Sequence, residues 1–418
     1  MTDSHASETV FETLSGAEAT DSRTEARNGL RHIASLSMTK IADGLINPKL
    51  VLSWLLTALG APAYLVGALV PIREAGALLP QVFLAGWVAR MRHRKWAWVI
   101  GSAGQGIAAA LIVLAALTLT GAAAGWAIAG LLALLAVSRA MASVSYKEVL
   151  GKTVRKTRRG GVTGFAASAA SIGVLAFAVL LISGLAQSQG VVIGAIGLAA
   201  LLWLAAAMLF STLEELASDP DRQGGGVDWA ILRDNPQLRR FILVRGLLVS
   251  TALAPPYLVL LGGGEGGQLG QLGALVLASA AASLVSSWIW GRMADRSSRR
   301  VLMLSGAVGA VAMLAALALD LAGLAGAVWA MPAVLFVLMI AYHGVRQGRS
   351  TYLVDMAPED RRAAWSAVAN TVIGSILLAV GALGGAAALL GPEVGLLLFA
   401  GLAALAPVAA LGLDEVER

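Results

Sequence analysis

Long apolar segments separated by short polar turns constrain this chain more than any other feature. From about residue 41 the segments run roughly 18 to 28 residues, and about 20 helical residues cross a hydrocarbon core of about 30 Å. Isolated strands leave backbone groups unsatisfied in lipid, so the segments are expected to be helices. We predict twelve transmembrane helices, near 41–61, 63–89, 95–119, 122–146, 162–185, 190–211, 240–261, 269–293, 300–320, 326–353, 363–389 and 393–412.

The composition agrees with a bilayer as the solvent. Hydrophobic residues make up 58% of the 418 positions and charged residues 13%, with a mean hydropathy of +0.77. A soluble protein would expose too much apolar surface at this composition. The fold class expected is therefore an all-α polytopic membrane protein. The chain has no cysteine, which excludes disulfides and thiolate metal sites, and its scattered histidines lack metal-ligand spacing. We expect no metal and no cofactor.

The distribution of Lys and Arg predicts the topology. Both residue types are absent from 96–138, 160–221, 246–291, 301–345 and 363–417. Each of these stretches holds two apolar segments, or one hairpin, and the turns between the stretches are strongly basic. The positive-inside rule places the basic turns and both termini in the cytoplasm of a bacterial inner membrane. The net charge of +6 is thus explained by topology and does not indicate nucleic-acid binding.

The chain repeats itself at about half its length. The turn from Gly291 to Arg300 has a fainter copy from Gly86 to Lys95, 205 residues earlier, and Arg346 follows Arg139 by 207 residues. Parallel halves predict two six-helix bundles related by an axis along the membrane normal. The expected parts are a cytoplasmic tail (1–40), a first bundle (41–211), a cytoplasmic linker (212–239), a second bundle (240–413) and a short tail (414–418).

With these halves around it, the repeated turn resembles that of the major facilitator superfamily of secondary transporters. The family's turn reads roughly Gly-x-x-x-Asp-Arg-x-Gly-Arg-Arg. The second copy here keeps Gly291, Asp295, Arg296, Arg299 and Arg300. The first copy keeps Gly86, Arg94 and Lys95, while Arg90 stands at the position of the acid. The resemblance implies twelve spans, but no subfamily follows from it.

The resemblance also implies a gate. In the family the acid of this turn contacts the start of a helix in the opposite half, where unpaired amides favour a carboxylate. Asp295 would then meet the chain near 161–165. Because the first copy has the opposite charge, we expect Arg90 to pair with Glu359 or Asp360. The alternative is that both turns only anchor the topology.

Charges inside the predicted spans are costly and need partners or a cavity. Arg73 lies about 20 Å of helix from Gly86, and Glu74 adjoins it. Helical neighbours diverge by about 100°, so these two are expected to meet other helices or the cavity. In one reading Arg73 holds an anionic group and Glu74 carries protons. In the other they belong to an ion-pair lock between helices.

Arg139 and Arg346 occupy related places in the fourth and tenth spans. The resemblance implies that the first, fourth, seventh and tenth spans line the cavity, so both arginines are candidates for substrate contact. Arginine binds carboxylate or phosphate with two parallel hydrogen bonds; the alternative is snorkelling to the interface. Asp43 and Lys49 are assigned to the membrane interface. Further cavity candidates are Tyr342, His343 and Asn370, the last also as a contact between helices.

These features predict a secondary transporter rather than an enzyme. We expect it to move a small organic solute, with a preference for an anion, by alternating access driven by protons. An exporter of drugs or metabolites with the same fold stays open, as does a receptor or sensor without transport. The partners expected are the solute, protons and the lipid bilayer, with no nucleic acid, and the protein is expected to be a monomer.

Overall fold

The computed structural model describes residues 11–13, 23–184, 188–219, 227–263, 269–294, 296–358 and 361–416, excluding the side chains at 287, 288, 291 and 363. Helices are the only regular elements among these residues. Eleven of the described helices are long and apolar enough to cross a membrane. The all-α polytopic fold expected from the sequence is therefore confirmed, and the chain is a multi-pass membrane protein.

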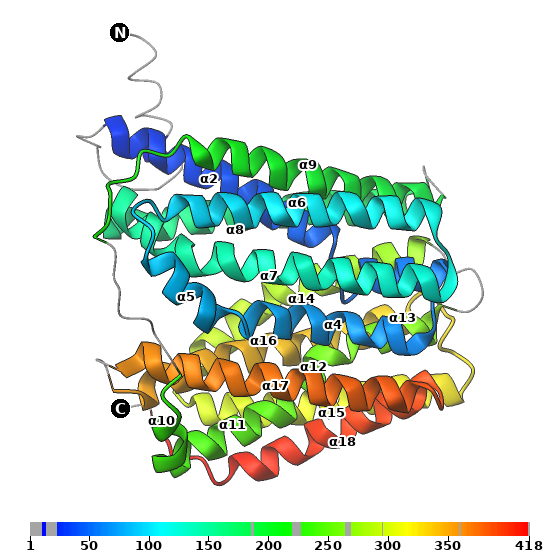
Figure 1. The fold of residues 1–418 in the computed structure, drawn as a ribbon. Helices are drawn as coiled ribbons and strands as arrows, with labels where there is room; N and C mark the ends of the chain where they lie inside the picture. Colours follow the sequence, from blue (N-terminus) through cyan, green and yellow to red (C-terminus); the bar gives the residue numbers. More distant parts are fainter. Residues whose placement is uncertain are drawn as a thin grey trace.

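The helices pack as two groups, seen in the upper and lower parts of Figure 1. The first half contains α2 (Arg23–Leu45), α3 (Val51–Ala58), α4 (Ala63–Leu78), α5 (Gln81–Ala89), α6 (Lys95–Thr118), α7 (Gly121–Thr153), α8 (Lys156–Ile182) and α9 (Gln189–Ser211). The second half contains α10 (Trp229–Asp234), α11 (Pro236–Leu248), α12 (Ser250–Leu253), α13 (Pro255–Gly262), α14 (Leu269–Ala294), α15 (Ser298–Leu321), α16 (Ala330–Met356), α17 (Arg362–Ala388) and α18 (Pro392–Ala410).

The first expected span differs most from its prediction. The expected range holds only the end of α2, followed by α3, and α2 begins at Arg23, well before residue 41. Proline disfavours the helical conformation of the residue before it and lacks an N–H, which explains the interruption at Asn47-Pro48. The Asn47 side chain accepts a hydrogen bond from the Lys49 amide at 2.9 Å and stabilises the turn. This span is not among the eleven helical segments that are long and apolar enough to cross a membrane.

Proline also divides two other spans. The second becomes α4 and α5, which separate at Leu79-Pro80, and the seventh becomes α11, α12 and α13, the last of which starts with Pro255-Pro256. Pro71 is accommodated inside α4. Proline interrupts a helix because it lacks an N–H and because its ring clashes with the preceding turn. Arg73 and Glu74 lie in one of these interrupted spans, whereas Arg139 and Arg346 lie in the continuous helices α7 and α16.

The basic turns, the start of α2 and the end of α18 lie at one end of the bundle, on the left in Figure 1. We call it the basic end and the opposite one the far end. The halves meet where α4 packs along α17, α8 along α14, and α3 against α13. A Cβ on Gly381 would lie 2.1 Å from the Pro71 ring, so only glycine permits this approach of α17 to α4.

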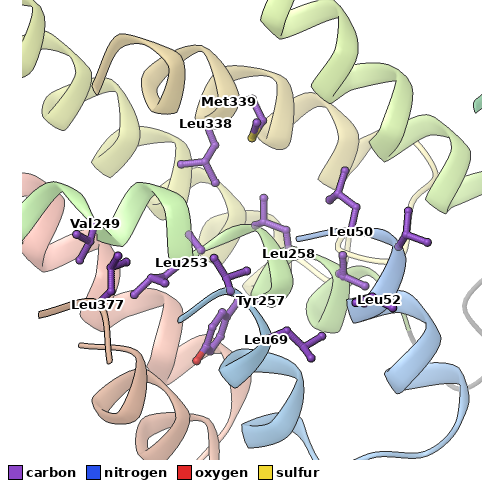
Figure 2. Packing of buried hydrophobic residues seen from close by; sticks show 14 of the residues in the cluster. Leu50, Leu52, Leu69, Val249, Leu253, Tyr257, Leu258, Leu338, Met339 and Leu377 are labelled. Atoms are coloured by element: carbon purple, nitrogen blue, oxygen red, sulfur yellow. The ribbon is translucent and has the colours of Figure 1, made fainter. Parts of the chain in front are cut away.

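A shared apolar core joins the halves beside these contacts. Leu50, Leu52 and Leu69 of the first half lie near Leu253, Tyr257 and Leu258 of the second (Figure 2). Tyr257 is fully buried, and a Cβ on Gly67 would lie 2.5 Å from its hydroxyl oxygen. Its ring meets Phe399 edge-on, with centroids 5.1 Å apart. These close contacts around Tyr257 hold the two halves together.

Candidate functional site

A three-membered ion cluster lies inside the first half. The Asp43 carboxylate of α2 accepts a hydrogen bond from Arg73 Nη2 of α4 at 3.2 Å and another from Arg139 Nη1 of α7. The Arg73 side chain is only 12% exposed. One carboxylate thus serves two guanidinium groups, which would otherwise leave uncompensated charge inside the protein. We refer to these three residues as the Asp43 cluster.

A second cluster connects the two halves through Lys49. At the break between α2 and α3, Lys49 Nζ lies 3.6 Å from Glu74 Oε1. The same ammonium group lies 3.5 Å from the centroid of the Tyr342 ring, which belongs to α16 of the other half. A cation over an aromatic face gains about 0.5 to 2 kcal/mol, more when water is excluded. Lys49 therefore makes a charged contact across the boundary between the halves.

The second half has cations without such partners. Arg346 and Arg349 of α16 form no hydrogen bond and no ion pair with any residue that the structure describes. Both line a cavity of about 510 Å³ between α14 and α16, together with Ser286 and His343. Arg245 of α11 is buried and donates from Nη2 to Asn370 Oδ1 at 3.1 Å.

The two sets of charges lie close together. A narrow cavity of about 30 Å³ is lined by Glu74 of the first half and by Arg245, Arg346 and Arg349 of the second. Lys40 of α2 is near enough to Arg346 and Asp43 to interact with both. In this region basic side chains clearly outnumber the two carboxylates. The basic side chains are Lys40, Lys49, Arg73, Arg139, Arg245, Arg346 and Arg349.

Comparison with known proteins identifies the fold. No protein-family model and no curated protein matches the sequence. Solved structures do match. The nucleoside transporter NupG superimposes with a TM-score of 0.68 at 14% identity, over 92% of this chain and 98% of that one. The POT family transporter PepTSo gives 0.69 at 12%, over 92% and 97%. The inward open xylose transporter XylE from E. coli gives 0.63 at 13%, over 92% and 96%.

The chain has the major facilitator fold. Identities this low show the fold alone, so the chemistry has to come from the residues of this chain. Among the expected cavity residues, Arg73 and Arg139 both bind Asp43. Glu74 and Tyr342 both contact Lys49. Asn370 accepts a hydrogen bond from Arg245. His343 and Arg346 line the larger cavity. No group of three or more acidic or histidine side chains suited to a metal occurs in the described parts.

The turn typical of the major facilitator fold is anchored differently in the two halves. In the first half Gly86 lies in α5 and Arg90 ends it. Glu215, which follows α9, accepts hydrogen bonds from the Arg94 amide at 3.1 Å and the Lys95 amide at 2.8 Å. This buried carboxylate also lies 3.3 Å from Lys152 Nζ. Glu215 thus satisfies the free amides at the start of α6, where the chain lacks a capping side chain.

In the second half α15 carries its own cap. The Ser297 hydroxyl accepts a hydrogen bond from the Arg300 amide at 3.1 Å and donates to Glu415 Oε2 at 2.7 Å. Arg299 binds the same carboxylate at 2.9 Å, and Arg296 is exposed. Gly291 lies in α14. The gating contacts of Arg90 and Asp295 stay predictions, because Asp295, Glu359 and Asp360 lie outside the described residues.

Sequence reasoning missed the partners at the centre of the site. It assigned Asp43 and Lys49 to the membrane interface, whereas they contact Arg73, Arg139 and Glu74. One signal could have found them, since Arg73 and Glu74 require opposite charges and the first span offers one of each sign. Arg245 was missed as well, although it lies five residues inside the seventh expected span. The helix break at Asn47-Pro48, which positions Lys49, is a tertiary detail that the sequence pattern did not predict.

Proposed function

We propose that the protein is a secondary transporter that carries a small anionic organic solute across a bacterial inner membrane by alternating access. The observation that carries this proposal is the surplus of basic side chains around the narrow cavity between the two halves. Arg346 and Arg349 matter most, because they form no hydrogen bond or ion pair among the described residues. Unpaired charge in a site partly withdrawn from water is costly, and an anionic solute would relieve that cost. A site built this way favours anions over neutral or cationic solutes of similar size.

The packing of the halves supports a route from the basic end. The halves are joined through α4 with α17 and α3 with α13, beside the apolar core around Tyr257. Arg346, Gln347 and Ser350 are exposed on the part of α16 nearer the basic end. The positive-inside rule makes this end cytoplasmic. In this proposal the described state is the inward-facing one, and transport requires the halves to separate at the far end.

Protons drive the cycle in this proposal, with Glu74 as the coupling carboxylate. Protonation of Glu74 would remove its attraction for Lys49, 3.6 Å away. Lys49 also contacts Tyr342 across the boundary between the halves, so the charge of Glu74 acts directly on an inter-half contact. Glu74→Gln should retain exchange of solute but lose accumulation against a gradient in proteoliposomes with an imposed pH difference. Accumulation by this variant at the wild-type level would exclude Glu74.

The solute can be found by thermal stabilisation of the purified protein. A ligand at a hundred times its Kd stabilises the folded state by about 2.7 kcal/mol. We expect small organic anions, and not their neutral amides or esters, to raise the melting temperature. Each stabilising anion is then tested for counterflow in proteoliposomes. Stabilisation by neutral solutes alone would overturn the preference for anions, and binding without counterflow would indicate a receptor instead of a transporter.

A further inference from the structure

We propose that the cavity between α14 and α16 binds a doubly charged tetrahedral oxyanion, of the kind carried by a phosphate monoester, on Arg346 and Arg349. This inference rests on the proposed function and narrows it to one site and one class of anionic group. Nothing in the Asp43 cluster takes part in it. The argument depends on which guanidinium groups are already occupied, on their number and on the hydroxyl beside them.

The guanidinium groups of the two halves are in different states. Arg73 and Arg139 both bind the Asp43 carboxylate, so an incoming anion would have to displace an internal one. Arg346 and Arg349 form no hydrogen bond or ion pair among the described residues, although the Glu74 carboxylate is near enough to interact with Arg349. An anion that enters the protein can therefore bind Arg346 and Arg349 on α16 without displacing the Asp43 carboxylate. Arg139 and Arg346 occupy related positions in the two halves, but only Arg346 is free to bind an incoming anion among the described residues.

The number of free cations points to a dianion. Residues three apart on a helix lie on the same side, so Arg346 and Arg349 can contact one group. A carboxylate carries one negative charge on two oxygens, which a single guanidinium fork satisfies. A phosphate monoester carries nearly two charges and three terminal acceptor oxygens at neutral pH. It can therefore offer acceptor oxygens to both guanidinium groups, whereas the two oxygens of a carboxylate are satisfied by one guanidinium.

A buried hydroxyl completes the set of donors. The Ser286 side chain of α14 lines the same cavity, is 2% exposed, and its oxygen has no hydrogen-bond partner among the described residues. A buried hydroxyl without a partner is unfavourable, so this one fits a donor for a ligand oxygen. The cavity of about 510 Å³ leaves room for an organic group attached to the phosphate.

The test is calorimetric binding at pH 7.5 to the full-length protein in detergent. The probes are phenyl phosphate, a dianion, and its methyl diester, a monoanion of the same shape, with benzoate and inorganic phosphate beside them. We expect phenyl phosphate to bind at least tenfold more tightly than the diester or benzoate. Equal affinity for all three would overturn the inference. Inorganic phosphate distinguishes the sources: tight binding of it indicates free phosphate as the ligand, and weak binding indicates an organic monoester.

Variants locate the site. Arg346→Gln and Arg349→Gln should each weaken phenyl phosphate binding about tenfold or more, since hydrogen bonds to charged groups are the strong ones. Arg346→Lys keeps the charge without the fork and should lie between wild type and Arg346→Gln. The matched control is Arg361→Gln, which removes an exposed arginine that pairs with Asp228 at 2.9 Å away from the cavity. Its affinity should equal that of wild type.

Two further results keep the inference falsifiable. If an arginine variant does not fold, Ser286→Ala takes its place, with an expected loss of about threefold or more. An equal loss in Arg139→Gln and Arg346→Gln would move the anionic group to the centre of the protein and overturn the assignment. The proposed function fails separately: counterflow of carboxylates with no binding of phenyl phosphate would leave transport standing and remove only this site.

Discussion

The two halves use arginine at related positions in opposite ways. Arg139 in the first half binds Asp43 together with Arg73. Arg346, 207 residues later, faces a cavity and has no partner among the described residues. The same difference appears at the basic end, where Glu215 is buried at the start of α6 and Glu415 is 39% exposed beside α15. The first half binds Arg139 in an internal ion pair, and the second leaves Arg346 available to a ligand.

The largest expected effect is on transport. Arg346→Ala combined with Arg349→Ala should lower kcat/KM for the transported anion by at least about a thousandfold, because two charged hydrogen-bonding groups are lost together. Arg139→Ala should lower it by less than about tenfold. Initial uptake rates in proteoliposomes measure both. Similar losses in the two variants would show that the halves do not differ in the way described.

The next effect concerns stability. Asp43→Asn leaves Arg73 and Arg139 without a counter-charge and should lower the free energy of unfolding by about 3 kcal/mol. Adding Arg139→Gln should recover part of the loss, since the two residues act as one unit. Unfolding in mixed micelles at increasing denaturant fraction gives the values. If Asp43→Asn were as stable as wild type, the Asp43 cluster would contribute nothing measurable to the free energy of unfolding.

The extension of α2 before the first expected span predicts a pH effect that belongs to the first half. His32 is fully buried, its Nε2 lies 2.7 Å from Thr153 Oγ1, and burial lowers its pKa from 6.5 to about 3. The unfolded chain takes up the proton first, so the stability from neutral His32 is present above pH 6.5 and lost as the pH falls below it. Between pH 7.5 and 5 we expect a loss of about 2 kcal/mol. In His32→Gln this contribution to the pH dependence should disappear.

The smallest effect compares the two acids at the basic end. Glu215→Ala removes a buried carboxylate that accepts from two amides and should cost about 1.5 kcal/mol or more. Glu415→Ala removes an exposed pair with Arg299 and should cost less than about 1 kcal/mol. Thermal unfolding of the two variants side by side measures the difference. The reverse order would show that Ser297 and Arg299 depend on Glu415 more than the exposure of the pair suggests.

Sequence patterning predicted the membrane fold well because bilayer thickness and backbone hydrogen bonding leave few choices. Segment lengths, the gaps in Lys and Arg, and the half-length repeat were enough for helices, halves and turns. The candidate site was predicted only in part. Arg73, Glu74, Arg139 and Arg346 were found because charge inside an apolar segment is conspicuous. Their partners were not found, because Asp43 and Lys49 lie near a segment end where charge is ordinary.

The sequence by itself determined that this chain is a helical membrane protein with two related halves, since apolar length and the positions of basic residues are local properties. It also determined which side chains carry unusual charge. Only the tertiary structure decided which of those charges are satisfied. Asp43 reaches two arginines on α4 and α7, and the break at Asn47-Pro48 turns Lys49 toward Glu74 and Tyr342. These ion pairs depend on which helices, distant in sequence, lie side by side in space. A local sequence pattern does not determine that arrangement.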